Sequence, residues 1–444
     1  MEFVCERELC TGCSLCSDVC AHEAITMCED RNGFIAPVVD GDKCADCGLC
    51  QKCCPVLNPD RVASNKLSNL EVYEAWATKD EVRKRSSSGG VFGQLAHDLL
   101  LAGGVVVGAS FDGKKAYHKD VADVAELRSI QDTKYVQSCA HGSYKKTLRY
   151  LKEGKNVIFS GTPCQVAACK SYIYKKHYEG RLLTVELVCH GVPSYLALKK
   201  SMEYVGADTV VSFRDKKEGW GYHSQHMTYK TKEGKLIYKK REEDLFYRMF
   251  FCEKLLRESC YSCPFAHMPR IADITIGDSW GTSNKNKADV FKGLSLLLVN
   301  NENGKRWLGE NKHVMLRSTS WLDSIYINRN VYTPFPPPYL IDKIPDVYSW
   351  ITRLDAKEYM KNTTLGYIEQ VKTNNAISEK IRRANVKFRR RLLDMTESKD
   401  LNAFKFLLLI ASYKLDSIVN PKASERYLDG KFTDFLRILF KSKK

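Results

Sequence analysis

Short apolar runs separated by polar loops recur through the middle of the chain and predict a series of β-strands. The run Val105–Phe111 follows an amphipathic stretch, Phe92–Ala102, which predicts a helix ended by two glycines. Strands and helices alternate here, so we expect an α/β fold. The remaining predicted strands are 71–78, 156–160, 182–188, 210–214, 274–276, 294–299 and 314–317.

The two ends of the chain differ from this middle part. Residues 1–60 hold two cysteine-rich repeats and predict a small α+β module, followed by a polar linker from Asn58 to Leu70. A proline-rich segment, 333–338, breaks regular structure. Beyond it, the apolar positions predict helices at 376–395 and 401–419. We therefore expect four parts: a module at 1–60, a mixed α/β domain in two parts at 70–155 and 156–325, and a helical extension at 340–444.

Charge changes this picture only at the C-terminus. The 444 residues carry a formal net charge of +16, and more than half of the excess lies in residues 351–444. Because the rest of the chain is only mildly basic, we expect no nucleic-acid partner. The basic helices could face solvent, an acidic partner or an anionic membrane surface, so peripheral membrane contact stays open.

Cysteine usage indicates the compartment. The 18 cysteines cluster at metal-ligand spacing in a long chain instead of forming the framework of a short secreted protein. The N-terminus lacks a basic region followed by an apolar run, and no stretch approaches the ~20 apolar residues of a membrane span. We therefore expect a cytoplasmic protein.

The two N-terminal cysteine repeats share the spacing C-x2-C-x2-C-x3-C. In bacterial ferredoxins three cysteines of one repeat and the last of the other hold each four-iron four-sulfur (4Fe-4S) cluster, so we predict two clusters. Zinc binding is the alternative, since a zinc ribbon would need only four of the eight thiols. Cys53 competes with Cys54, which the following proline favours, and we expect Cys5 and Cys28 to be spare buried thiols. The predicted ligand sets are Cys10, Cys13, Cys16 and Cys54, and Cys44, Cys47, Cys50 and Cys20.

A third cluster is predicted from Cys252, Cys260 and Cys263, the last two at C-x2-C spacing with a proline after the second. We take Cys189, at the end of a predicted strand, as the fourth ligand. Cys164 and Cys169 are its competitors, and zinc or buried free thiols are alternatives.

Three loops follow predicted strands or precede predicted helices, where backbone amides and the helix dipole favour an anion. They are residues 86–90, 161–165 and 189–194. Caps and turns are the alternative interpretation of such loops. Lys134 could stabilise an anionic reduced flavin, and His190 could supply a proton; a solvent-exposed lysine and a structural histidine are the alternatives. The candidate cofactor-binding residues are Ser87, Ser88, Gly89, Gly90, Lys134, Gly161, Thr162, Pro163, Cys164 and Gln165, and the candidate catalytic residues are Lys134 and His190.

Several motifs occur together in one order between about residues 71 and 320. They are Arg85-Ser-Ser-Ser-Gly-Gly-Val-Phe, Thr133-Lys-Tyr-Val-Gln-Ser, Gly161-Thr-Pro-Cys-Gln, Cys189-His-Gly-Val-Pro-Ser, the run of Cys252, Cys260 and Cys263, and Ala272-Asp-Ile-Thr-Ile-Gly-Asp-Ser-Trp280. By these motifs the chain resembles the coenzyme F-420 hydrogenase/dehydrogenase beta-subunit family, with a two-cluster ferredoxin domain in front.

This resemblance implies an iron-sulfur flavoprotein that uses FAD to move electrons between clusters and an organic hydride acceptor. It implies a redox partner of the ferredoxin or flavodoxin class, or a hydrogenase or dehydrogenase subunit, and leaves an oligomer open. A subunit that only relays electrons to a partner enzyme, in polysaccharide biosynthesis for instance, is the alternative. The resemblance does not cover the basic C-terminal helices.

Overall fold

The computed structural model describes residues 3–62, 65–221, 225–280, 287–319 and 346–362. The chain divides into two units, Met1–Ala356 and Lys357–Lys444. All elements below belong to the first unit. The helices expected at 376–395 and 401–419 and the proline-rich segment 333–338 lie outside the described residues.

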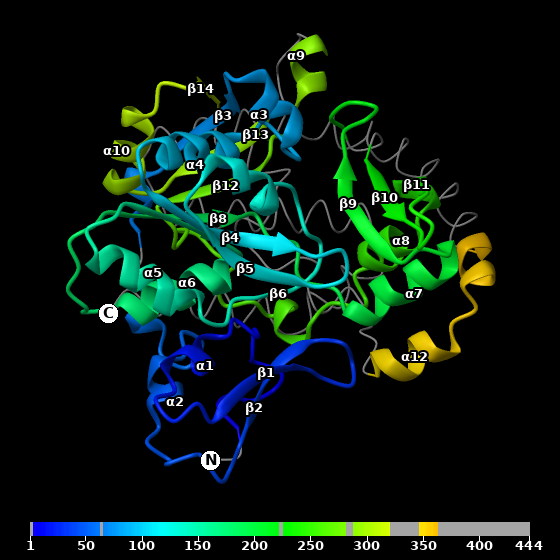
Figure 1. The fold of residues 1–444 in the computed structure, drawn as a ribbon, viewed down its shortest axis with the longest axis horizontal. Helices are drawn as coiled ribbons and strands as arrows, with labels where there is room; N and C mark the ends of the chain where they lie inside the picture. Colours follow the sequence, from blue (N-terminus) through cyan, green and yellow to red (C-terminus); the bar gives the residue numbers. More distant parts are fainter. Residues whose placement is uncertain (1–2, 63–64, 222–224, 281–286, 320–345, 363–444) are drawn as a thin grey trace, which may run out of the picture. The chain divides into compact units, whose positions relative to one another are not determined.

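A nine-stranded mixed sheet lies at the centre of the first unit (Figure 1). Four neighbouring strands, β12, β8, β7 and β4, run parallel, as the predicted alternation of strands and helices requires. All the predicted strands form, although 210–214 joins a different sheet. In order across the sheet the strands are β14 (Val314–Ser318), β3 (Glu71–Ala77), β13 (Ser295–Val299), β12 (Ile274–Asp278), β8 (Leu182–Leu187), β7 (Val157–Gly161), β4 (Val105–Phe111), β5 (Ala116–Val121) and β6 (Ser138–Cys139).

Helices cover both faces of this sheet, which makes three layers (Figure 1). Val106 packs into one apolar cluster and its neighbour Val107 into another, because successive side chains of a strand point to opposite faces. Burial on both faces explains why the inner strands are continuous apolar runs. The covering helices are α4 (Val91–Leu101) and α10 (Glu302–Glu310) on one face, and α5 (Ser143–Lys152) and α6 (Pro163–Ile173) on the other.

The N-terminal cysteine repeats form a small module beneath α5 and α6 (Figure 1). Leu15 and Cys53 of this module pack into the same apolar cluster as those two helices. The predicted linker is fixed to the sheet domain, since the Arg61 guanidinium donates to the Ser171 hydroxyl at 3.0 Å and to its carbonyl at 3.1 Å. The elements of the module are α1 (Leu15–Val19), β1 (Ile25–Glu29), β2 (Ile35–Val39) and α2 (Leu49–Cys53).

A second, three-stranded sheet includes the hairpin of β10 and β11, which the sequence analysis did not predict. The expected boundary at 155/156 falls between β4 and β7, which pair side by side in the large sheet. Among the described residues, no helix is both long and apolar enough to cross a bilayer. The remaining elements are β9 (Thr209–Asp215), β10 (His226–Lys230), β11 (Leu236–Lys240), α3 (Asp80–Arg85), α7 (Tyr195–Val205), α8 (Leu245–Phe251), α9 (Lys287–Lys292) and α12 (Val347–Arg353).

Candidate functional site

The two cysteine repeats fold into the same local structure. The residues on either side of the second cysteine have positive φ in both repeats: 62° at Gly12 and 70° at Ser14, and 49° at Asp46 and 67° at Gly48. Each turn leads directly into a helix, α1 or α2. A turn of this kind lets closely spaced cysteines face one point, which is what a cubane cluster requires.

The first predicted ligand set lines a single cavity of about 370 Å³, including its mouth. Cys10, Cys13 and Cys16 come from the first repeat, and Cys54 comes from the end of the second. Cys53, the competitor of Cys54, lies outside this cavity and is buried in the apolar cluster under α6. Burial raises the pKa of the Cys54 thiol. Binding to a metal centre would therefore have to be accompanied by deprotonation of this thiol.

Cys5 and Cys28 differ from the expectation that both are spare buried thiols. Cys28 is exposed, because β1 belongs to a two-stranded sheet and turns this residue to solvent. Cys5 is half-buried, lines the cavity of the first set and is hydrogen-bonded to Cys54. Burial raises the pKa of Cys5 to about 12. The first cavity therefore has a fifth thiol beside its four predicted ligands.

The second predicted ligand set lies nearer the surface. Burial raises the pKa of Cys50, and the neighbouring Cys20 and Cys47 thiols add to this rise, so these three lie close together. The Cys44 thiol donates to the Asp46 carboxylate at 3.7 Å, and Cys47 is exposed. Nowhere in the described parts of the chain do three His, Cys, Asp or Glu side chains converge on a point suited to a single metal ion.

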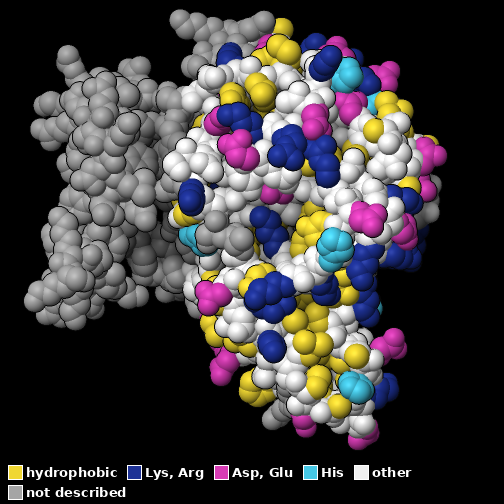
Figure 2. Space-filling model, turned by 90° about the vertical axis from the view of Figure 1, so that its left-hand side faces the viewer, with side chains coloured by type: hydrophobic (Ala, Val, Ile, Leu, Met, Phe, Trp, Pro, Cys, Tyr) yellow, Lys and Arg dark blue, Asp and Glu magenta, His cyan; other side chains and the backbone are white. Residues whose placement is uncertain are grey.

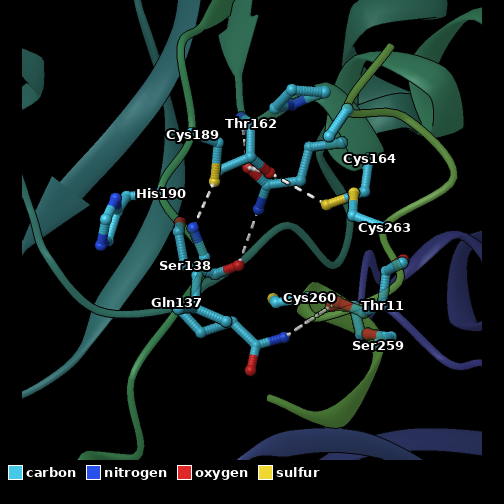
Figure 3. Close-up of a pocket in the computed structure, with 16 residues that line it drawn as sticks. Thr11, Gln137, Ser138, Thr162, Cys164, Cys189, His190, Ser259, Cys260 and Cys263 are labelled. Carbon is cyan, nitrogen blue, oxygen red and sulfur yellow. Dashed lines mark hydrogen bonds between the residues drawn. The ribbon is translucent and has the colours of Figure 1, made fainter. Parts of the chain in front are cut away.

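A third group of thiols surrounds a cavity of about 690 Å³, including its mouth (Figure 3). Cys164 lies in the first turn of α6, Cys189 follows β8, and Cys260 and Cys263 lie in the loop after α8. Burial raises the pKa of Cys189 to about 12 and that of Cys263 to about 11, and the Cys164 thiol adds to both rises. Four half-buried thiols on one cavity fit the donor set that a 4Fe-4S cluster needs, and the third cluster stays a prediction.

Two cysteines weighed for this third group lie elsewhere. Cys252, which we predicted as a ligand, is the residue after α8, and its thiol donates to the Met249 carbonyl at 2.9 Å. It is not among the residues that line the cavity. Cys169 is fully buried in the apolar cluster beside β7. Cys164, a competitor of Cys189 in the sequence analysis, thus lines the cavity where Cys252 does not, and the ligand set of a third cluster stays a prediction.

The first and third cavities share a wall made of Thr11 and Gly12, both of which line both cavities. The Gln137 amide donates to the Gly12 carbonyl at 3.1 Å, and the Arg257 guanidinium and the Ser259 hydroxyl each donate to the Cys10 carbonyl at 3.0 Å. Arg257 is only 4% exposed. The sequence analysis did not identify these residues as functional. Gln137 lies in the motif that begins at Thr133, and Arg257 lies between Cys252 and Cys260.

The loop Gly161–Gln165, predicted to bind a flavin, belongs to the third thiol cavity. Thr162, Pro163, Cys164 and Gln165 all line it. Gln165 accepts from the Thr162 backbone N–H at 3.0 Å and donates to the Ser138 carbonyl at 2.9 Å, so the loop is held against the end of β6. This capping box begins α6.

The other predicted flavin loop packs against β13. The Ser88 hydroxyl donates to the Leu294 carbonyl at 2.7 Å, and the Gly89 N–H donates to the Ser295 hydroxyl at 3.0 Å. Gly90 precedes α4 with a φ of 86°. Ser87 accepts from the Thr133 N–H at 2.8 Å, so this loop does adjoin the predicted lysine motif.

Lys134 is half-buried and donates to the Gln131 carbonyl. Burial lowers its pKa to about 8, against a smaller opposing effect of Asp132. Neither Lys134 nor residues 87–90 line the third cavity. The predicted flavin residues are therefore divided between the third cavity and the loop beside β13, and FAD binding stays a prediction.

His190 lines the third cavity, but its ring points away from the thiols in Figure 3. Its Nε2 lies 3.0 Å from the Glu253 carboxylate. The ring packs against Phe250 and Phe251, with centroid distances of 5.4 and 5.8 Å. An imidazole beside a carboxylate suits proton exchange, and the catalytic role of His190 stays a prediction.

A fully buried ion pair, Arg270 with Glu186, lies close to two thiols of the third cavity. The Arg270 Nε donates to Glu186 at 2.5 Å, and Arg270 Nη1 donates to the Phe265 carbonyl at 3.0 Å. The positive charge of Arg270 also opposes the rise in pKa of Cys189 and Cys263. Arg270 therefore orders the turn after Cys263 and places a positive charge near two thiols.

Two segments of the chain match known families. Residues 9–58 match the 4Fe-4S dicluster domain, and residues 154–318 match the C terminus of the coenzyme F-420 hydrogenase/dehydrogenase beta subunit. None of the curated proteins matches. A solved structure, a xenon derivative of the F-420-reducing nickel-iron hydrogenase complex from Methanosarcina barkeri, is 14% identical, covers 61% of this chain and 89% of its own, and has a TM-score of 0.42, too low to carry an argument. Over these two segments the chain is thus similar to the 4Fe-4S dicluster domain and to the C terminus of the coenzyme F-420 hydrogenase/dehydrogenase beta subunit.

Proposed function

We propose that this protein is an oxidoreductase that carries electrons through three 4Fe-4S clusters to or from an organic hydride acceptor. Its two matched families are both those of redox proteins, one an iron-sulfur domain and the other a subunit of an oxidoreductase. In this proposal residues 1–60 act as the ferredoxin domain, and residues 70–325 hold the third cluster and the acceptor.

The observation that carries the proposal is the wall of Thr11 and Gly12 between two thiol-lined cavities. The first set adjoins the second, because the Cys50 thiol contributes to the raised pKa of Cys16. It also adjoins the third, because the Cys164 thiol contributes to the raised pKa of Cys13. The three sets therefore form a series in which the first set stands between the other two.

The roles of the surrounding residues follow from this series. Thiolates of the three sets hold the clusters. Arg257 and Gln137 hold the wall and so fix the separation of the first and third clusters. His190 and Glu253, at the far side of the third cavity, are the pair we propose to exchange a proton with the acceptor.

FAD, when bound, would join one-electron transfer by clusters to two-electron transfer by a hydride acceptor. The predicted flavin residues do not all line the third cavity, and no step above depends on FAD. It stays a prediction from the family resemblance.

Anaerobic purification followed by iron, sulfide and flavin analysis tests the proposal. We expect about twelve iron atoms per chain, four for each of three clusters. About eight would remove the third cluster, and a chain with no acid-labile sulfide would refute the proposal. Cys263→Ser should lose about four iron atoms and keep about eight.

The alternative function is an electron-transfer subunit that only relays electrons to a partner enzyme. The matched family consists of beta subunits of hydrogenases and dehydrogenases, which favours a partner subunit. Reduction of a deazaflavin by the isolated, prereduced chain would support the enzyme, whereas reduction only after a partner subunit is added would support the relay.

A further inference from the structure

The N-terminal module has the opposite charge to the rest of the protein. Residues 1–58 contain 10 Asp and Glu against 4 Lys and Arg, whereas the whole chain has a net charge of +16. The module is therefore negatively charged, whereas the protein as a whole is positively charged. Charge of one sign around a redox site steers the encounter with a partner of the opposite sign.

Part of this acidic charge surrounds the second cysteine set. Glu23, Asp40, Asp42 and Asp46 are all exposed, and we call these four residues the acidic rim. The Asp40 N–H donates to the Ala24 carbonyl at 2.8 Å, so the turn that follows Cys20 lies beside the loop that leads to Cys44. The rim therefore belongs to one surface, formed by both cysteine repeats.

The same surface brings a predicted cluster close to solvent. Cys47 is exposed, whereas the thiols of the third set are all half-buried. Two exposed apolar side chains flank the loop that carries Cys44 and Cys47. Val38 in β2 is 54% exposed, and Leu49 at the start of α2 is 40% exposed. Figure 2 shows hydrophobic side chains gathered on the lower lobe of the molecule with acidic side chains at its lower edge.

Exposed apolar side chains and charged side chains on one small surface are typical of a transient interface. The second cluster is also the end of the proposed series that faces outward, so electrons entering or leaving by a soluble carrier would cross here. Lys43 is the basic residue inside the rim, and its ammonium pairs with Asp40 at 3.0 Å, which leaves the surface with a negative excess.

We propose that the surface around Cys44 and Cys47 docks a small redox protein whose own docking face is basic, and that electrons are exchanged with it through the second cluster. This inference rests on the proposed function. An acidic carrier would be repelled here. In each exchange one electron leaves a reduced cluster and reduces one oxidised centre of the carrier, and no proton needs to move.

The test uses ferric cytochrome c, a basic haem protein, and its succinylated form, in which surface lysines carry carboxylates. The full-length protein is reduced anaerobically, freed of reductant and mixed with each acceptor in a stopped-flow instrument. We expect the unmodified cytochrome to react at least ~10-fold faster at low salt, and this ratio to approach one near 0.5 M salt because charges are screened.

A matched pair of variants locates the effect. Neutralising part of the rim with Glu23→Gln, Asp40→Asn and Asp42→Asn should slow the low-salt reaction by ~5–10-fold, since steering is lost. The control triple Glu81→Gln, Glu302→Gln and Glu310→Gln makes the same change in net charge on α3 and α10 and should change the rate less than ~2-fold.

Equal rates with both cytochromes, or equal effects of the two triple variants, would overturn the proposal. So would a salt-sensitive dimer, seen by sedimentation, that slows the reaction as protein concentration rises, because a second copy of this chain would then be the occupant. Iron content and bleaching by dithionite are measured on the same samples. Intact, reducible clusters with no rim effect refute the docking surface alone, whereas absent clusters refute the proposed function.

Discussion

Replacing Gly12 by alanine should destabilise the wall between the first and third cavities. Gly12 has a φ of 62°, and a Cβ atom there would lie 2.5 Å from the Ile35 carbonyl oxygen and 2.8 Å from Arg257 Nη2. A left-handed conformation costs a non-glycine residue about 1–2 kcal/mol. Displacing Gln137 and Arg257 adds about 1–3 kcal/mol, the range for overpacking a filled site. We therefore expect Gly12→Ala to lower the free energy of unfolding by about 2–5 kcal/mol.

Gly48→Ala is the matched control. Gly48 has a φ of 67°, but a Cβ atom there would meet nothing within 4 Å. Gly48→Ala should therefore lower the free energy of unfolding only by the cost of the left-handed conformation, about 1–2 kcal/mol. Urea unfolding monitored by circular dichroism measures both variants, and stopped-flow reduction of the clusters should show slower transfer to the third cluster in Gly12→Ala alone. Equal losses of stability and unchanged transfer rates in both variants would refute the reasoning that Gly12 is required by close approach.

Three further outcomes are expected. Cys164→Ser should lose about four iron atoms per chain and Cys252→Ser none, so equal iron in both would restore Cys252 as a ligand. Cys54→Ser should lower the iron content or alter the electron paramagnetic resonance of the first cluster, while Cys53→Ser leaves both unchanged; the reverse result would reassign the ligand. Burial lowers the pKa of Lys134 from 10.5 to about 8, so the folded state releases a proton that the unfolded chain keeps, and this contribution makes stability rise with pH between those values. Lys134→Met should flatten that rise in urea unfolding at pH 7.5 and 9.5, and an unchanged slope would contradict the burial argument.

The strands that could be predicted from the sequence are those whose burial makes them continuous apolar runs. The inner strands are buried on both faces and are therefore apolar runs, so β4, β7 and β13 were predicted close to their true bounds. β11 alternates exposed and half-buried positions and contains charged residues, so it carries no such signal. β6 has only two residues, too few for a period.

The candidate site was predictable where ligands lie close in the sequence. Spacing alone selected the cysteines of the N-terminal repeats, and the structure places the first set around one cavity. Cys164 is far from Cys260 in the chain, and the parallel pairing of β7 and β8 is what brings its loop beside Cys189. Cys252 is near Cys260 in the sequence, but its thiol donates to the Met249 carbonyl of α8 and does not line the cavity. Local spacing therefore identifies local ligands, and strand order decides the others.

The hydrogen bonds that fix the linker have a kinetic consequence. A module on a loose tether would exchange electrons with its neighbour only when diffusion brought the two together. Here Arg61 is held by Ser171, and Asn65 donates to the Arg270 and Ala272 carbonyls at 2.8 Å. Transfer between the first and third clusters should therefore proceed without domain motion, at a rate that is independent of solvent viscosity.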